Sequence, residues 1–130
     1  EVHNYHFFYG IPISQELIAS NALHAAFVHA PIGNNDTTPL PSPSELANGE
    51  IELRVNNVLV DRGLGGDIFG SGPLQSVAWL VGQLARRGKA LEPGELVLPG
   101  RAVALHRLSP GDVVEARFGP WGRCAAEFPA

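Results

Sequence analysis

The stretch Gly65-Gly66-Asp67-Ile68-Phe69-Gly70-Ser71-Gly72-Pro73-Leu74 decides the fold, because it ends a run of strand patterns and opens the main helix. Pro73 suits the first turn of a helix, where its missing N–H is not needed, and the preceding Ser71-Gly72 offers a cap. A basic pair and then Gly88 form a natural stop. We therefore predict a helix over about residues 73–87. Its apolar face carries Leu74, Val77, Ala78, Val81, Leu84 and Ala85.

Strand patterns lie on both sides of this helix. Residues 50–55 alternate strictly between polar and apolar types, and Asn56-Asn57 supplies a turn before Val58-Leu59-Val60. This pattern predicts a hairpin whose apolar side chains face the core. Downstream, the sequence predicts a short buried strand at Glu95–Leu98, a turn at Ser109–Asp112, an alternating strand from Val114 to Phe118, and a closing strand with Cys124, Ala126 and Phe128 on its apolar side.

The first fifty residues mix strand, helix and loop signals. Residues 1–9 are rich in aromatic and β-branched types and predict a strand. Ser14 can cap a short helix, and residues 23–30 return to strand character. Residues 31–49 contain four prolines and are expected to form a long loop. The chain is thus predicted to be a mixed α+β, mainly β, single domain over residues 1–130.

Composition narrows the function classes. Apolar residues make up 45% and charged residues 17%, which is typical of a globular domain. A net charge of −4 argues against nucleic acid or an anionic membrane as partner, and no apolar run is long enough to span a bilayer. The single cysteine, Cys124, excludes an internal disulfide. We expect a cytoplasmic protein and, because the chain lacks Met and begins within a strand pattern, a fragment, processed product or subunit of a larger assembly.

The order of motifs resembles the C-terminal half of the 2-keto-4-pentenoate hydratase group, within the fumarylacetoacetate hydrolase superfamily. The motifs concerned are Gly65–Leu74, the helix that follows, Val97–Gly100 and Ser109–Asp112. The resemblance implies a rolled β-sheet with one main helix packed against it, and an oligomer. It also implies that Mg²⁺ or Mn²⁺ chelates a small 2-oxo acid substrate and acts as a Lewis acid.

Individual positions can be carried over from that family. Glu1 falls on a metal-ligand position, and Asn21-Ala22 falls on the centre of the family's Asp-Asn-Ala-Ser-Ser-Gly element. The resemblance implies substrate contacts from Asn21, Leu23 and Gly100. The family's remaining ligands, a Glu-x-Glu pair, and its catalytic lysine and aspartate would lie upstream of this chain. Glu50-Ile51-Glu52 matches a later hairpin instead, and we expect a solvated outer face there.

Two candidate catalytic residues stand where the chain departs from the family pattern. The small Ser-Ser-Gly is replaced by Leu23-His24-Ala25, and Arg101 follows Gly100 where the family prefers a small residue. His24 is either a general base, since histidine titrates near neutrality, or a packed, hydrogen-bonded side chain. Arg101 is either a bidentate clamp for a carboxylate or a surface charge. His3 and His6 would face opposite sides of a strand, as would His24 and His29, so a histidine-based zinc site is not expected.

Three functions remain open from the sequence. The first is part of a divalent-metal-dependent, hydratase-like lyase, completed by an upstream segment or by a partner chain in a homo- or hetero-oligomer. The second is a non-catalytic subunit or ligand-binding relative with a degenerate site, which the altered Asn4, His6, Leu23 and Arg101 favour. The third is a metal-independent isomerase or cyclase of secondary metabolism, in which His24 transfers protons. Glu1 could equally be a frayed terminal residue that binds no metal, because the first residues of a chain are often poorly ordered.

Overall fold

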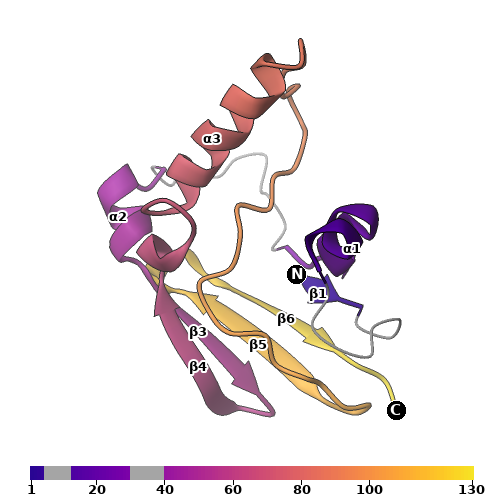
Figure 1. Cartoon of the computed structure of the whole chain (residues 1–130). Coiled ribbons are helices and arrows are strands. Elements are labelled where there is room, and N and C mark those ends of the chain that lie inside the picture. The colour runs from indigo at the N-terminus through magenta and orange to yellow at the C-terminus, as the bar shows by residue number, and fades with distance from the viewer. Residues whose placement is uncertain (5–12, 30–39) are drawn as a thin grey trace.

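The computed structural model describes residues 1–4, 13–29 and 40–130 (Figure 1). Two antiparallel sheets and a few short helices make up the described part, which confirms a mixed, mainly β fold. No described helix has the length and apolar character needed to cross a membrane. The elements are β1 (Val2–His3), α1 (Ser14–Ala19), η1 (Asn21–Leu23), β2 (His24–Ala26), α2 (Pro43–Asn48), β3 (Glu50–Val55), β4 (Val58–Leu64), η2 (Gly65–Asp67), α3 (Pro73–Ala85), β5 (Val113–Phe118), η3 (Gly119–Trp121) and β6 (Arg123–Glu127).

The larger sheet has four antiparallel strands in the order β4-β3-β5-β6. Its first hairpin is the one predicted, and Asn56 and Asn57 take the positive φ angles of 52° and 66° that a tight hairpin turn requires. The Asn56 side chain also holds β5 in place. Its Nδ2 donates to Asp112 Oδ1 at 2.8 Å, and its Oδ1 accepts from the Val113 N–H at 2.9 Å.

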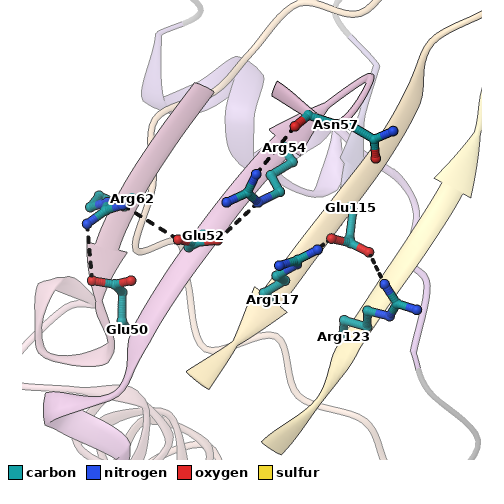
Figure 2. A network of polar contacts seen from close by, with 8 residues as sticks. All are labelled: Glu50, Glu52, Arg54, Asn57, Arg62, Glu115, Arg117 and Arg123. Carbon is teal, nitrogen blue, oxygen red and sulfur yellow. Dashed lines mark hydrogen bonds and ion pairs between the residues drawn. The ribbon is translucent and has the colours of Figure 1, made fainter. Parts of the chain in front are cut away.

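The two faces of this sheet differ in chemistry. One face carries apolar side chains, among them Ile51, Leu53, Val114, Ala116 and Cys124, which the strand register brings together. The other face carries a network of ion pairs, shown in Figure 2, whose members are Glu50, Glu52, Arg54, Arg62, Glu115, Arg117 and Arg123. Glu50 and Glu52 lie on this polar face, where both carboxylates pair with arginines. The Glu50 side chain is 49% exposed and the Glu52 side chain 18%, so the solvated position predicted for both is found for Glu50 and only in part for Glu52.

Helix α2 corrects the long loop predicted over residues 31–49, of which residues 31–39 lie outside the described part. A capping box explains why a helix forms among the prolines. Ser42 accepts from the Glu45 N–H at 3.3 Å, and the Glu45 carboxylate accepts from the Ser42 N–H at 2.8 Å. Pro43 occupies the first turn, where it is tolerated. The Ser-x-x-Glu pattern was present in the sequence and outweighs the proline content.

Helix α3 begins at Pro73 as predicted and ends at Ala85, two residues before the predicted end. Gly72 caps it at φ 132°, and Gly88 takes φ 66° just beyond its end. There the N–H groups of Gly88 and Lys89 donate to the carbonyls of Ala85 and Leu84, which is the Schellman arrangement. The expected burial of its apolar face against the sheet is not found among the described residues. No α3 side chain is buried, and Trp79 is 54% exposed.

The segment between α3 and β5 has no regular strand, so the short buried strand predicted at Glu95–Leu98 is wrong. No described strand lies beside this segment to pair with its backbone, and the Leu96 side chain is 55% exposed. Further along, the segment crosses the apolar face of the sheet at Gly63, where a Cβ atom would lie only 2.0 Å from the Ala102 carbonyl oxygen. The predicted turn at 109–112 is confirmed by the Asp112 N–H bond to the Ser109 carbonyl.

The N-terminal part forms a second, two-stranded sheet of β1 and β2, with α1 and η1 between them in the chain. Helix α1 confirms the predicted short helix, but its cap differs. Ile13, not Ser14, is the N-cap, and Glu16 supplies the missing acceptor by binding the Ile13 N–H at 2.8 Å. Strand β2 is shorter than predicted, since residues 27–29 have no strand pairing. The predicted strand beyond residue 4 lies outside the described residues.

Candidate functional site

The β1–β2 sheet gathers three polar side chains on one face. His3 and His24 are directly opposite each other in the antiparallel register. Glu1 precedes His3 by two residues, so it points to the same side of the strand. The structure therefore brings together Glu1 and His24, which the sequence singled out separately, and adds His3 to them.

The Glu1 carboxylate makes the central contacts. Its Oε1 lies 2.9 Å from Nδ1 of His24, which is hydrogen-bond distance, and its Oε2 lies 3.5 Å from Nε2 of His3. All three side chains are about one-quarter exposed, with values of 22 to 26%. They are therefore accessible to a small ligand while being held in place by one another. Behind them, the Phe27 ring lies 6.2 Å from the His24 ring.

The backbone that leads into His24 has an uncommon conformation. Asn21, Ala22 and Leu23 take φ angles of 52°, 56° and 65°, so three consecutive residues lie in the left-handed region. Asparagine tolerates this region, but alanine and leucine do so at a cost of about 1 kcal/mol or more each. Such strain persists only where surrounding contacts enforce it, and it gathers at functional sites. Here the enforcing contacts are the burial of Leu23, which is 3% exposed, and its carbonyl bond from the Asn4 N–H at 2.8 Å.

The predicted substrate-binding residues fall in two places. Asn21 and Leu23 stand directly before His24, with the Leu23 side chain packed inside the protein and the Asn21 side chain exposed. Gly100 lies on the segment after α3, at φ 119°, and a Cβ there would touch Ile68 at 3.4 Å. Arg101 follows it, is exposed, and donates through Nη1 to the Val103 carbonyl at 3.1 Å. No contact between Arg101 and Glu1 or His24 occurs within the described residues.

Asp61 of β4 positions the segment that carries Gly100 and Arg101. Its Oδ2 accepts from the Ala104 N–H at 2.7 Å, and its Oδ1 accepts from the Arg62 N–H at 2.8 Å. These backbone donors, Ala104 first, hold the pKa of Asp61 below its ordinary value, and His106 at 3.6 Å adds to the effect. An ionised Asp61 therefore fixes where this segment crosses the sheet. Sequence reasoning missed this role, because the contact joins residues 43 apart.

The donor set limits what the site can hold. Within residues 1–4, 13–29 and 40–130, no three histidine, cysteine or acidic side chains are arranged to bind a metal ion. Hard cations such as Mg²⁺ prefer several oxygen ligands, and the face described above offers one carboxylate beside two imidazoles. The described residues thus fit one corner of such a site and not the whole. What they form alone is an acid–base cluster.

His3 was missed as a member of the cluster. The sequence reasoning compared histidines only within one strand, where His3 and His6 face opposite ways, and did not pair one strand with the other. The available signal was the spacing of Glu1 and His3, which places both on one face of a strand. Which residue of β2 lies opposite depends on strand register, and that register is irregular between Val2 and His3.

The chain is similar to known enzymes in both sequence and fold, which confirms the resemblance found in the motifs. It is 38% identical over 69 residues to a 2-keto-4-pentenoate hydratase of Paraburkholderia xenovorans, covering 53% of this chain and 25% of that protein. It is 32% identical over 78 residues to a 4-oxalocrotonate decarboxylase of Pseudomonas putida, covering 60% of this chain and 29% of that one. No family model matches the chain.

A solved structure carries the same similarity. The 4-oxalocrotonate decarboxylase from Pseudomonas putida G7, complexed with magnesium and adipate, superposes with a TM-score of 0.60 at 31% identity. The superposition covers 65% of this chain and 32% of that one. The same enzyme has been solved with calcium and acetate. The matched region thus spans between a quarter and a third of the length of these relatives.

Proposed function

We propose that this chain forms part of a divalent-metal-dependent lyase, of hydratase or decarboxylase type, that acts on a small 2-oxo acid. The contact between Glu1 and His24 is the observation that supports it most directly. It joins a candidate metal ligand to a candidate proton-transfer group at the end of a strained backbone segment. The relatives are a hydratase and a decarboxylase named for 2-oxo acid substrates, and the solved decarboxylase was crystallised with magnesium.

Glu1 would supply one ligand to Mg²⁺ or Mn²⁺. A carboxylate offers about four lone-pair positions on two oxygens. Oε1 is engaged by His24, whereas Oε2 makes only the longer contact with His3, so a cation can be bound without breaking the His24 bond. When bound, the ion supplies Lewis-acid activation of the 2-oxo acid. The remaining ligands would come from residues outside the described part, in the same polypeptide or in a partner chain of a homo- or hetero-oligomer in the cytoplasm.

His24 would transfer the proton. An ionised carboxylate only accepts hydrogen bonds, so Nδ1 of His24 carries the hydrogen in its bond to Glu1. In the neutral imidazole this leaves a lone pair on Nε2, which can act as a general base. Glu1 therefore fixes both the tautomer and the ring orientation. The left-handed segment before His24 sets the position of its backbone in turn.

The other predicted residues would bind the substrate. Arg101 uses one guanidinium nitrogen to bind the Val103 carbonyl, which leaves N–H groups for a substrate carboxylate. Gly100 would offer its backbone to that substrate on the side away from Ile68. Asn21 would contribute its exposed amide, and Leu23 would act by holding the strained turn.

The test measures the loss of 2-hydroxypenta-2,4-dienoate by ultraviolet absorbance, with Mg²⁺ or Mn²⁺ titrated into the metal-free form of the complete protein that carries this chain, together with any co-purifying chain. We expect activity only with the metal. His24→Asn keeps an N–H donor near the Nδ1 position but has no group at Nε2, so kcat should fall by about 10²–10⁴ while calorimetry still shows Mg²⁺ binding. Glu1→Gln should weaken Mg²⁺ binding itself. Lys89→Ala, an exposed position after α3, is the control and should change neither.

Two other functions keep specific support. The hydrogen-bonded Glu1–His24 pair also suits a metal-independent isomerase, in which case activity would survive a chelator and fall in both variants. The lack of a three-ligand cluster in the described residues suits a non-catalytic, ligand-binding relative. That function predicts no turnover with any metal, alone or with a co-purifying chain. A fully active His24→Asn protein would contradict the proposed proton transfer.

A further inference from the structure

The outer edge of β6 has backbone groups with no partner strand among the described residues. In the larger sheet β6 pairs only with β5 among the described residues, so its other edge faces no described strand. In an antiparallel ladder, alternate residues point their N–H and C=O groups toward the neighbouring strand. The Phe118 N–H donates to the Gly122 carbonyl, and the Phe128 N–H donates to the Asp112 carbonyl. These two bonds show that the even-numbered residues of β6 direct their backbone N–H and C=O groups toward β5. Arg123, Ala125 and Glu127 therefore direct their backbone groups outward.

The charges along this edge are arranged symmetrically about Ala125. Arg123 stands two residues before it and Glu127 two residues after it, and all three side chains are exposed on one face. Arg123 already pairs with Glu115 at 2.8 Å through one guanidinium nitrogen (Figure 2), which leaves further N–H groups free. Glu127 has no ion pair among the described residues. Edge strands are often protected by charges that repel a second strand, and here the two charges are opposite in sign.

We propose that the outer edge of β6 binds a second copy of itself, antiparallel, with a two-fold axis at Ala125. In that register Ala125 faces Ala125 of the other copy, and each Arg123 faces a Glu127. The three outward-facing residues of each strand then all find hydrogen-bonded partners. Two cross-strand ion pairs close the ends, and the small alanine side chains leave room at the axis. An isologous contact of this kind closes as a dimer and does not extend to a filament.

Neighbouring registers are poorer. Centring the pair one residue earlier places Arg123 opposite Ala125 and leaves Glu127 beyond the pairing. Centring it one residue later brings Pro129 opposite Arg123, and Pro129 has no N–H to donate at an outward-facing position. Only the register centred on Ala125 pairs every outward donor and opposes unlike charges. The dimer would join the two sheets into one, with the ionic face of Figure 2 continuous across both copies.

The first test follows the mass of the purified protein that carries this chain, by light scattering over a wide concentration range. We expect a concentration-dependent dimer. Glu127→Arg places arginine opposite arginine at both ends and should weaken the dimer by on the order of tenfold or more. Glu92→Arg makes the same charge change on the exposed segment after α3 and should leave it unchanged. Far-ultraviolet circular dichroism of both variants confirms that the fold is intact.

The second test is a cross-link at the axis. Directly opposed residues of a hydrogen-bonded pair have Cα atoms about 5.5 Å apart, within the range of a disulfide. Ala125→Cys in a Cys124→Ser background should therefore form a disulfide-linked dimer under mild oxidation. Ala90→Cys, also exposed, is the control and should form no disulfide-linked dimer. A protein that stays monomeric at every concentration, or one in which Ala90→Cys cross-links as readily as Ala125→Cys, would overturn the proposal.

Discussion

Gly63 is the point where a single methyl group should test the architecture most sharply. A Cβ atom at this position would lie 2.0 Å from the Ala102 carbonyl oxygen and 2.9 Å from its carbonyl carbon. Gly63→Ala must therefore push two backbone segments apart by roughly 1 Å or more to restore van der Waals contact. Both partners are main chain, and the Ala104 N–H is tied to Asp61, so the clash has no flexible side chain to absorb it.

Overpacking of this kind destabilises by about 1–3 kcal/mol, and the rigid partner favours the upper half of that range. For a domain of this size we expect Tm to fall by about 6–15 °C, measured by circular dichroism. Gly82→Ala is the matched control. It adds the same methyl group inside α3 with nothing within 4 Å, and should raise stability by about 0.5–1 kcal/mol. A Gly63→Ala protein that melts at or above the wild-type temperature would refute the packing of residues 100–104 on β4.

Further changes test the cap, the turn and the ionic face. Ser42→Ala removes the cap of α2 and should lower the free energy of unfolding by about 1 kcal/mol in urea titrations. Asn57→Gly relieves a left-handed residue in the hairpin turn and should raise stability by roughly a few tenths of a kcal/mol in the same assay. Hydrogen bonds and charge from Arg117, and then from Arg123, hold the pKa of Glu115 below its ordinary value. A carboxyl lowered in the folded state adds stability above its unfolded pKa, and that stability is lost as the pH falls through the folded pKa. The melting temperature should therefore fall below about pH 4.5, and Glu115→Gln should flatten this dependence.

Local rules predicted the elements whose cause is local. The hairpin over 50–60 follows from strict alternation and the Asn56-Asn57 pair, and α3 follows from its end signals and helical spacing. Helix α2 was missed although the Ser42–Glu45 pattern that forms it is also local, because four nearby prolines pointed to a loop. The failure at Glu95–Leu98 has a different cause. An apolar run becomes a strand only if another strand offers its backbone, and that partner cannot be identified from the run itself.

The candidate site shows the same division. The motif order identified Glu1 and His24 as separate residues of interest, but their contact depends on how β1 and β2 align. The register of β1 against β2 is irregular between Val2 and His3, and the residue types there do not predict this irregularity. The left-handed turn at 21–23 was equally hidden, since Ala22 and Leu23 disfavour it and only tertiary contacts hold it. Roles that depend on contacts distant in sequence, such as Asp61 with Ala104, could not be read from spacing.

The side chain of Asn56 has a consequence for how the chain finds its native arrangement. The β3–β4 hairpin can form by pairing outward from its own turn. Strand β5 must instead pair across a long sequence separation, since Asn56 and Val113 are 57 residues apart. A shift of β5 by one residue relative to β3 would place all its apolar side chains on the ionic face of the sheet and its charged side chains on the apolar face. The Asn56 side chain at the hairpin turn bonds Asp112 and the Val113 N–H only when β5 is in its native register. These two hydrogen bonds therefore select that register during folding. Replacing that amide should slow assembly of the sheet far more than it loosens the finished hairpin.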